Sequence, residues 1–170
     1  NLPLISDTNT LKNTYDYKLF TELYEENITT LSFYMSASNS INNKNIKISE
    51  RLNVPSNRLR GFEQGKIGPK DGADFIGGNY VSALNLSSTL PSFLENAQNT
   101  DFLVFVDAAN IWGVDYDSSI DDSNKIRSSF GVGVDWFTPV GPLSFSLSQT
   151  LTKASTDITE SFRFNLGTSF

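Results

Sequence analysis

The sequence predicts an all-β protein, the C-terminal portion of an antiparallel up-and-down transmembrane β-barrel. Three observations predict it. Segments of strand length alternate apolar and polar residues, short and long polar connections alternate between them, and the chain ends on an aromatic residue. A period of two places one face of each strand in apolar surroundings and the other face in polar ones. Each segment has about the 9–11 residues that a tilted strand needs to cross a bilayer.

The first four segments differ in how clearly they alternate. In 14–24, tyrosine and leucine share one parity and charged residues the other. In 28–38, large apolar residues alternate with serine and threonine, and in 79–88, tyrosine and leucine alternate with asparagine and serine. The segment 101–112 is apolar on both parities, but Asp107 marks one of them. We therefore expect strands in all four, with Asp107 on the polar side.

The last three segments alternate most regularly. In 128–138, aromatic residues and valine alternate with serine, glycine and aspartate, and in 142–151, leucine and phenylalanine alternate with serine and threonine. The segment 162–170 alternates up to the final Phe170. A chain that ends on such a strand is expected to close a sheet with it and to carry a targeting signal there.

The connections form two sets. The short or compact set is 24–27, 89–100 and 138–141, and the set at the opposite ends of the strands is 40–78, 113–127 and 153–160. Short turns on one side and longer loops on the other are typical of bacterial outer-membrane barrels. Seven segments are fewer than the minimum of about eight strands for a closed bacterial barrel. We therefore expect about seven or eight strands of a larger barrel.

Composition narrows the functional classes. The net charge is −6 with no basic stripe, which argues against nucleic-acid binding. The chain has no histidine and no cysteine, so it lacks the usual general base, the thiol nucleophile and thiolate metal ligands. The acidic stretch 115–122 does not match the spacing or glycine placement of an EF-hand and is expected to be a solvated loop. We expect no enzyme activity, no metal and no cofactor.

A soluble β-sandwich or small barrel would also have short alternating strands. Its outward face would carry lysine and glutamate, whereas the polar parity here carries mostly serine, threonine, glycine and asparagine. Such residues suit a hydrated lumen, so the membrane barrel is favoured. A soluble domain that binds carbohydrate or protein, which would partition into buffer without detergent, stays the alternative.

Several sequence blocks resemble a known family. They are Leu59-Arg60-Gly61-Phe62, Gly68-Pro69-Lys70, Gly77-Gly78-Asn79, Trp136–Leu143 and the ending Phe162–Phe170. In this order, over roughly residues 45–170, they are similar to the C-terminal half of the BamA-type outer-membrane insertases of the bacterial surface antigen family. The resemblance implies a sixteen-stranded barrel that folds and inserts β-barrel proteins into the bacterial outer membrane. Residues 1–170 would be its C-terminal part, with 40–78 as the long sixth extracellular loop.

The resemblance also implies that this loop folds back into the lumen. Arg60, Gly61 and Phe62 would form the docking tip, in which Gly61 allows a tight turn. A guanidinium in a narrow lumen needs a planar acceptor, and a carboxylate accepts two of its hydrogens. Asp107 matches a wall aspartate of the family, and Asp135 is a second candidate of the same parity.

The resemblance implies further features of the family. In the family, a wall glutamate and a wall aspartate would together hold the loop arginine. Asn85 stands at the position of that glutamate, and its neutral amide cannot provide the second carboxylate. Phe162, Phe164, Gly167 and Phe170 would form the C-terminal signal for barrel assembly. POTRA domains and the first half of the barrel would precede Asn1. The expected partners are outer-membrane lipid, nascent β-barrel proteins and accessory assembly lipoproteins. A related protein secretion pore, of the two-partner secretion or TamA-like kind, and a passive porin are the competing functions.

Overall fold

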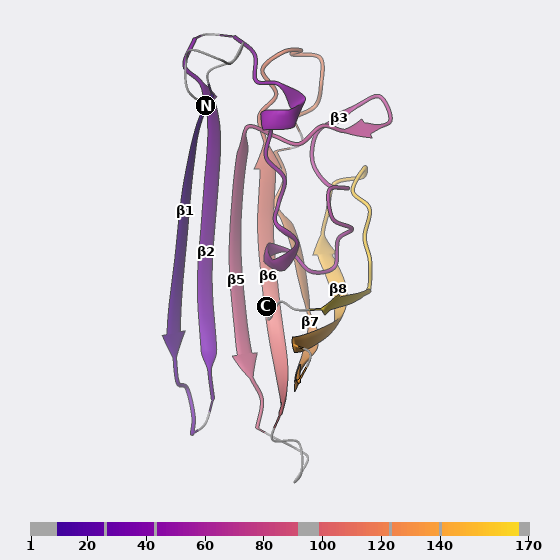
Figure 1. Ribbon diagram of the computed structural model, residues 1–170. Coiled ribbons are helices and arrows are strands. Elements are labelled where there is room, and N and C mark those ends of the chain that lie inside the picture. The colour runs from indigo at the N-terminus through magenta and orange to yellow at the C-terminus, as the bar shows by residue number, and fades with distance from the viewer. Residues whose placement is uncertain are drawn as a thin grey trace.

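The computed structural model describes residues 10–25, 27–42, 44–91, 99–122, 124–139 and 141–166. Its main feature is a curved seven-stranded sheet in the order β1-β2-β5-β6-β7-β8-β9 (Figure 1), in which every neighbouring pair is antiparallel. Apart from β2 and β5, which flank the long loop, sheet neighbours are also consecutive in the chain. The predicted all-β, up-and-down, antiparallel fold class is confirmed.

Five of the seven strands lie close to the predicted segments; the first begins four residues before the predicted 14–24 and ends three residues earlier, and residues 167–170 of the predicted last segment lie outside the described residues. The strands of the main sheet are β1 (Thr10–Thr21), β2 (Thr29–Ser40), β5 (Tyr80–Thr89), β6 (Thr100–Trp112), β7 (Arg127–Thr138), β8 (Gly141–Thr152) and β9 (Phe162–Leu166). The loop between β2 and β5 contains η1 (Ile48–Glu50), η2 (Ser56–Arg58) and a small hairpin of β3 (Lys70–Asp71) and β4 (Asp74–Phe75). Within the described ranges, no helix is long and apolar enough to cross a membrane.

One face of the main sheet exposes large apolar side chains. Neighbouring strands align them in cross-strand pairs, such as Phe145 with Phe164, whose ring centroids are 5.0 Å apart. A continuous apolar face of this size is not stable in water and is matched by lipid chains. This face includes Leu31, Met35, Leu84, Leu86, Val106, Phe130, Val132, Leu147 and Phe162.

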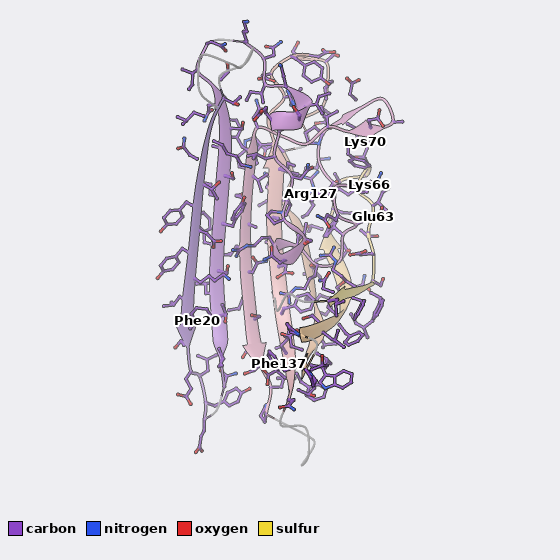
Figure 2. All side chains as sticks on the ribbon, in the orientation of Figure 1. Phe20, Glu63, Lys66, Lys70, Arg127 and Phe137 are labelled. Carbon is purple, nitrogen blue, oxygen red and sulfur yellow. The ribbon has the colours of Figure 1, made fainter. Side chains whose placement is uncertain are left out.

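Aromatic residues lie near both ends of the strands. Trp136 and Phe137, beside the short turn after β7, are 48% and 45% exposed, and Figure 2 shows Phe137 at that end of the sheet. At the opposite end, the rings of Tyr80 and Trp112 stack with centroids 5.7 Å apart. Aromatic side chains favour the headgroup level of a bilayer. The two groups therefore mark the membrane-spanning part of the strands.

The other face of the sheet is covered by the long loop rather than by water alone (Figure 1). The sequence predicted that this face is hydrated. Instead, the start of β5 and the end of β6 contribute apolar residues to a core that the loop completes. Burial of these side chains supplies the main driving force for placing the loop inside the curved sheet. The loop side of this core consists of Leu52, Val54, Leu59, Phe62 and Ile67, and the wall side of Val81, Ala83, Ala109 and Ile111.

The two faces can be distinguished by labelling single introduced cysteines, since residues 1–170 have no native cysteine and any cysteine elsewhere in the full-length protein can be replaced. Leu147 lies on the exposed apolar face, and the neighbouring Ser148 lies on the loop-covered face, where its hydroxyl donates to the Glu160 carbonyl oxygen at 3.4 Å. We expect brominated lipid to quench a fluorophore on Leu147→Cys strongly and one on Ser148→Cys weakly, in full-length protein in liposomes. Equal quenching at both positions would contradict the assignment of the faces.

Candidate functional site

Arg60 and Asp107 form a buried ion pair between the loop and the wall. The Nε and Nη2 atoms of Arg60 donate to the two carboxylate oxygens of Asp107 at 2.7 and 2.8 Å, and the Arg60 backbone N–H donates to Oδ2 at 3.0 Å. The two side chains are 4% and 0% exposed. The Arg60 guanidinium also lies over the Phe105 ring, 3.5 Å from its centroid. This bidentate, stacked geometry fixes the orientation of the loop tip as well as its position.

Asn85 lies beside this pair and acts as a donor. Its Nδ2 donates to Asp107 Oδ1 at 3.0 Å and to the Arg58 carbonyl oxygen at 2.7 Å. Its Oδ1 has no hydrogen-bond partner among the described residues. Asn85 therefore holds the carboxylate and the loop backbone, where a glutamate would instead have offered Arg60 a second acceptor.

The turn at Gly61 brings the backbone against the wall. Its φ of +89° is accessible to glycine without strain, and an added Cβ would come within 3.0 Å of the Ser129 Cβ. The Gly61 carbonyl oxygen accepts hydrogen bonds from Thr150 Oγ1 at 3.1 Å and from the Glu160 backbone N–H at 3.2 Å. Phe62 follows with 2% exposure. The tip thus contacts β7, β8 and the connection after β8.

The remaining predicted site residues lie elsewhere on the wall or outside the described ranges. Asp135 on β7 is buried and lies opposite Asp101 on β6 in the strand register. Its carboxylate accepts a hydrogen bond from the Ser144 hydroxyl at 2.5 Å. Phe162 and Phe164 are 56% and 49% exposed on the apolar face. Of the predicted C-terminal signal, Gly167 and Phe170 lie outside the described residues.

A second loop arginine, which the sequence reading did not single out, docks on β1. The Nη2 of Arg58 donates to both carboxylate oxygens of Asp16 at 2.7 and 2.6 Å. Its Nη1 donates to the hydroxyl of Ser32, and its guanidinium lies 5.4 Å from the Tyr34 ring centroid. Arg58 is 5% exposed. The loop is therefore anchored on β1 through Arg58, the last residue of η2, and on β6 through Arg60, two residues later.

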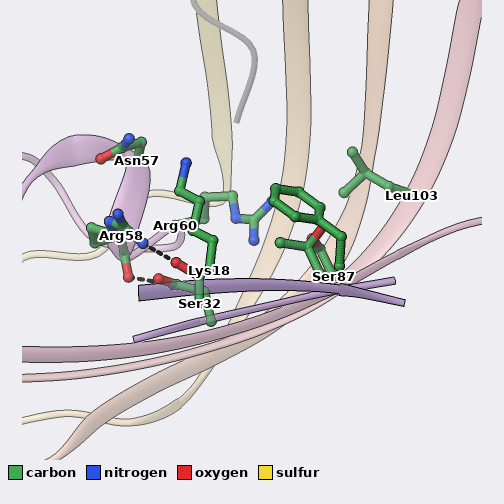
Figure 3. A pocket seen from close by; sticks show the side chains of 10 residues that line it. Lys18, Ser32, Asn57, Arg58, Arg60, Ser87 and Leu103 are labelled. Atoms are coloured by element: carbon green, nitrogen blue, oxygen red, sulfur yellow. Dashed lines mark hydrogen bonds between the residues drawn. The ribbon is translucent and has the colours of Figure 1, made fainter. Parts of the chain in front are cut away.

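A cavity of about 270 Å³ lies between these two anchors. Figure 3 shows the side chains of Lys18, Arg58 and Arg60 around it. Asn85 and Leu103 complete much of its wall. The cavity therefore presents cationic and amide groups to whatever occupies it.

Asp157 forms a further junction that sequence patterns did not indicate. Its carboxylate accepts from Arg127 Nε and Nη2 at 2.9 and 3.1 Å, from the Gly68 N–H at 3.2 Å and from the Ala154 N–H at 2.6 Å. Both charged side chains are fully buried. Figure 2 labels Arg127 at the loop end of the sheet. One carboxylate therefore joins β7, the long loop and the last connection.

The long loop also pairs with the last connection through the backbone. Glu63 N–H donates to the Ile158 carbonyl oxygen, and Ile158 N–H donates to the Lys66 carbonyl oxygen, each at 3.0 Å. Phe62 and Thr159 form an isolated antiparallel bridge at the same place. The connection after β8 thus leaves the main sheet and adds to the loop instead.

An outer cluster fastens the loop to the connection after β6. The Arg51 guanidinium pairs with Asp115 and lies 5.0 Å from the Tyr116 ring centroid. The Tyr116 hydroxyl donates to Asp71 at 2.7 Å, and this hydrogen bond raises the pKa of Tyr116 above its ordinary 10.0. Asp115, in the stretch expected to be a solvated acidic loop, is therefore a partner of the long loop.

Comparison with known proteins gives the family. The model of the Omp85 superfamily domain matches residues 2–170. The outer membrane protein assembly factor BamA of Neisseria meningitidis serogroup B is 28% identical over 139 residues, which cover 66% of this chain and 17% of that protein. BamA of Neorickettsia risticii is 28% identical over 117 residues, which cover 67% and 16%. A SAM50-like protein of Schizosaccharomyces pombe is 31% identical over 134 residues, which cover 75% and 28%.

A solved structure agrees with these relatives. The crystal structure of BamA from Haemophilus ducreyi lacking POTRA domains 1–3 superposes with a TM-score of 0.85 and 28% identity, covering 96% of this chain and 35% of that one. The chain thus spans about a third of that barrel-containing structure and a sixth of the two BamA sequences. The family match, the strand order and the apolar outer face agree on one conclusion: this chain belongs to the Omp85 superfamily and forms part of the wall of an outer-membrane β-barrel.

Proposed function

We propose that this wall belongs to a non-enzymatic assembly factor, which folds β-barrel proteins and inserts them into the outer membrane. The similarity to two proteins named as assembly factors and to a SAM50-like protein supports this proposal. The chain spans 17% and 16% of the two BamA relatives, so the partners of the whole protein are also proposed. These partners are nascent β-barrel clients, outer-membrane lipid and accessory lipoproteins.

One observation carries the proposal: a loop docked in the lumen through the buried Arg60–Asp107 pair. A passive porin needs an open aqueous path, whereas this loop builds an apolar core against β5 and β6 and holds its tip between Asp107 and Ser129. The long loop fills the space beside β5 and β6 with packed side chains instead of leaving it open to water. It therefore suits a barrel whose activity lies in its wall and edges rather than in conduction.

The client would be recognised by backbone pairing. β9 is the last strand of the described sheet, and in a closed barrel its outer edge would pair with the first strand of the barrel; where that pairing opens, the edge would offer unpaired N–H and C=O groups to an incoming strand. Unpaired backbone is heavily penalised inside a bilayer, so a client strand at such an edge gains stability from each ladder hydrogen bond. Phe162 and Phe164 of β9 are exposed on the apolar face and would contact the lipid-facing side chains of the same client strand.

Reconstitution tests this function. Liposomes that contain the full-length polypeptide should fold and insert a urea-unfolded outer-membrane barrel several-fold faster than empty liposomes, measured by the gel shift of the folded client. Their ionic conductance should stay low. High conductance without faster insertion would favour the porin, and translocation of an unfolded protein into the liposomes without insertion would favour the secretion pore.

A further inference from the structure

Among the described residue pairs, the ladder between β8 and β9 is the shortest in the main sheet. β9 pairs with β8 through five residue pairs, from Leu143 with Leu166 to Leu147 with Phe162, whereas β8 itself continues to Thr152. Each of the other described neighbouring pairs in this sheet has at least nine. Fewer ladder hydrogen bonds make local separation of a strand less unfavourable. Over the described residues, contacts outside the β8–β9 ladder can therefore contribute to holding β9 in place.

Arg163 supplies a contact of that kind. It lies in the middle of β9, is 8% exposed, and points to the loop-covered face. Its Nη1 donates to the carbonyl oxygens of Ser56 and of Leu59, the latter at 3.3 Å, and its Nη2 donates to that of Phe62 at 2.5 Å. Its Nε pairs with Glu160 at 2.5 Å. One side chain of the last strand thus holds three backbone carbonyls of the long loop.

The three carbonyls belong to the part of the loop that makes the lumen site. Ser56 begins η2, Leu59 lies between the two docking arginines, and Phe62 ends the tip. Leu59 and Phe62 are 3% and 2% exposed, so their carbonyls have little access to water if the guanidinium leaves. A buried acceptor that loses a charged donor loses more than an exposed one. Movement of Arg163 is therefore unfavourable for the loop, and movement of the loop is unfavourable for Arg163.

We propose that Arg163 couples the pairing of β9 with β8 to the docking of the long loop, so that the last strand leaves the sheet only as the loop tip is released. The wall anchor of the tip is Asp107 on β6, which lies three strands from β9 along the sheet but is linked to it by one network through Arg163. Arg163 is thus a positioning residue for the loop. The coupling concerns the conformations of the barrel itself, so it stands whether or not the proposed assembly function is correct.

A disulfide that locks β9 tests the coupling. Leu143 and Leu166 are cross-strand partners on the apolar face, and opposed residues of antiparallel strands lie within the Cα separation that a disulfide allows. We expect the lock, formed in full-length L143C/L166C protein in lipid nanodiscs, to slow hydrogen exchange of loop peptides covering residues 58–66. The expected slowing is about tenfold, because one hydrogen bond to a charged group is worth roughly that factor.

The same lock in an R163Q background should leave exchange of residues 58–66 unchanged, because the link between β9 and the loop is missing. Reciprocity requires that Arg60→Ala, which loosens the tip, also speeds exchange of β9 when Arg163 is present and not when it is replaced. Asn165→Ala, on the same strand, is the matched control and should preserve both effects.

If R163Q does not fold, R163K serves in its place, since lysine keeps the charge but cannot span three carbonyls, and the lock should then slow loop exchange by an intermediate factor. Equal protection of the loop by the lock with and without the Arg163 substitution would overturn the proposal. So would a lock that protects β9 and leaves the loop unchanged in the parent protein.

Discussion

Asp157→Ala should destabilise the folded protein by about 3–5 kcal/mol, the usual loss when one partner of a buried ion pair is removed. The Arg127 guanidinium would stay in a fully buried site without its carboxylate, and the N–H groups of Gly68 and Ala154 would lose their acceptor. The effect should appear as a lower denaturant midpoint of unfolding, followed by tryptophan fluorescence in lipid nanodiscs.

Two further variants sharpen this expectation. Asp117→Ala removes an exposed acid from the neighbouring connection and should change the free energy of unfolding by less than about 0.5 kcal/mol. Asp157→Asn keeps one acceptor oxygen but not the charge, so its effect should lie between those of the two alanine variants. If Asp157→Ala unfolded at the same denaturant concentration as Asp117→Ala, the junction would have no energetic role.

Asp157 also shows where sequence reasoning stopped. Alternation predicts which side of a strand a residue faces, and Asp107 and Leu147 lie on the buried and the exposed face, as their parities predict. Asp157 lies in a connection with no period, and its partners Arg127 and Gly68 are 30 and 89 residues away. Their meeting depends on how two loops fold together, which residue spacing does not encode.

The same limit applies to the character of the lumen. Serine and glycine on the inner parity of β7 and β8 led to the prediction of a hydrated face. The sequence contained the contrary signal in the segment 101–112, which is apolar on both parities because Ile111 and Ala109 are buried under the loop. A strand with two apolar faces is covered on both sides. The long loop, with its own leucines and Phe62, supplied the cover.

The predicted pair of Arg60 with Asp107 is present as a contact, but it came from the family resemblance rather than from periodicity. The pairing of Arg58 with Asp16 has similar geometry and was not foreseen, although Arg58 is two residues from Arg60. The segment 14–24, which contains Asp16, carries charged residues on its inner parity. In retrospect, an acid on the inner parity of a barrel strand indicates a cationic partner from a loop.

Arg60→Ala should release the loop tip and strongly reduce assembly of client barrels, while the variant itself still reaches the outer membrane. The substitution leaves the buried Asp107 carboxyl without its guanidinium partner, and its remaining donors among the described residues are the Asn85 amide and the backbone N–H at position 60. Loss of a buried partner is worth about 3–5 kcal/mol, enough to shift a docked loop to an undocked one. Protease accessibility of the loop and client levels in cells that depend on the variant measure the two effects.

A double-mutant cycle is a sharper test of the pair than a charge swap. Position 107 receives donors from Asn85 and from the backbone N–H of residue 60, so an arginine there would meet N–H groups instead of acceptors. We therefore expect R60D/D107R to remain defective. In the cycle of Arg60→Ala and Asp107→Ala, the double variant should be less defective than the sum of the singles, with a coupling energy of about 0.5–3 kcal/mol in stability. Additive effects would show that the two side chains act independently. Normal client assembly by the Arg60→Ala variant would show that docking of the loop is not required for the proposed function.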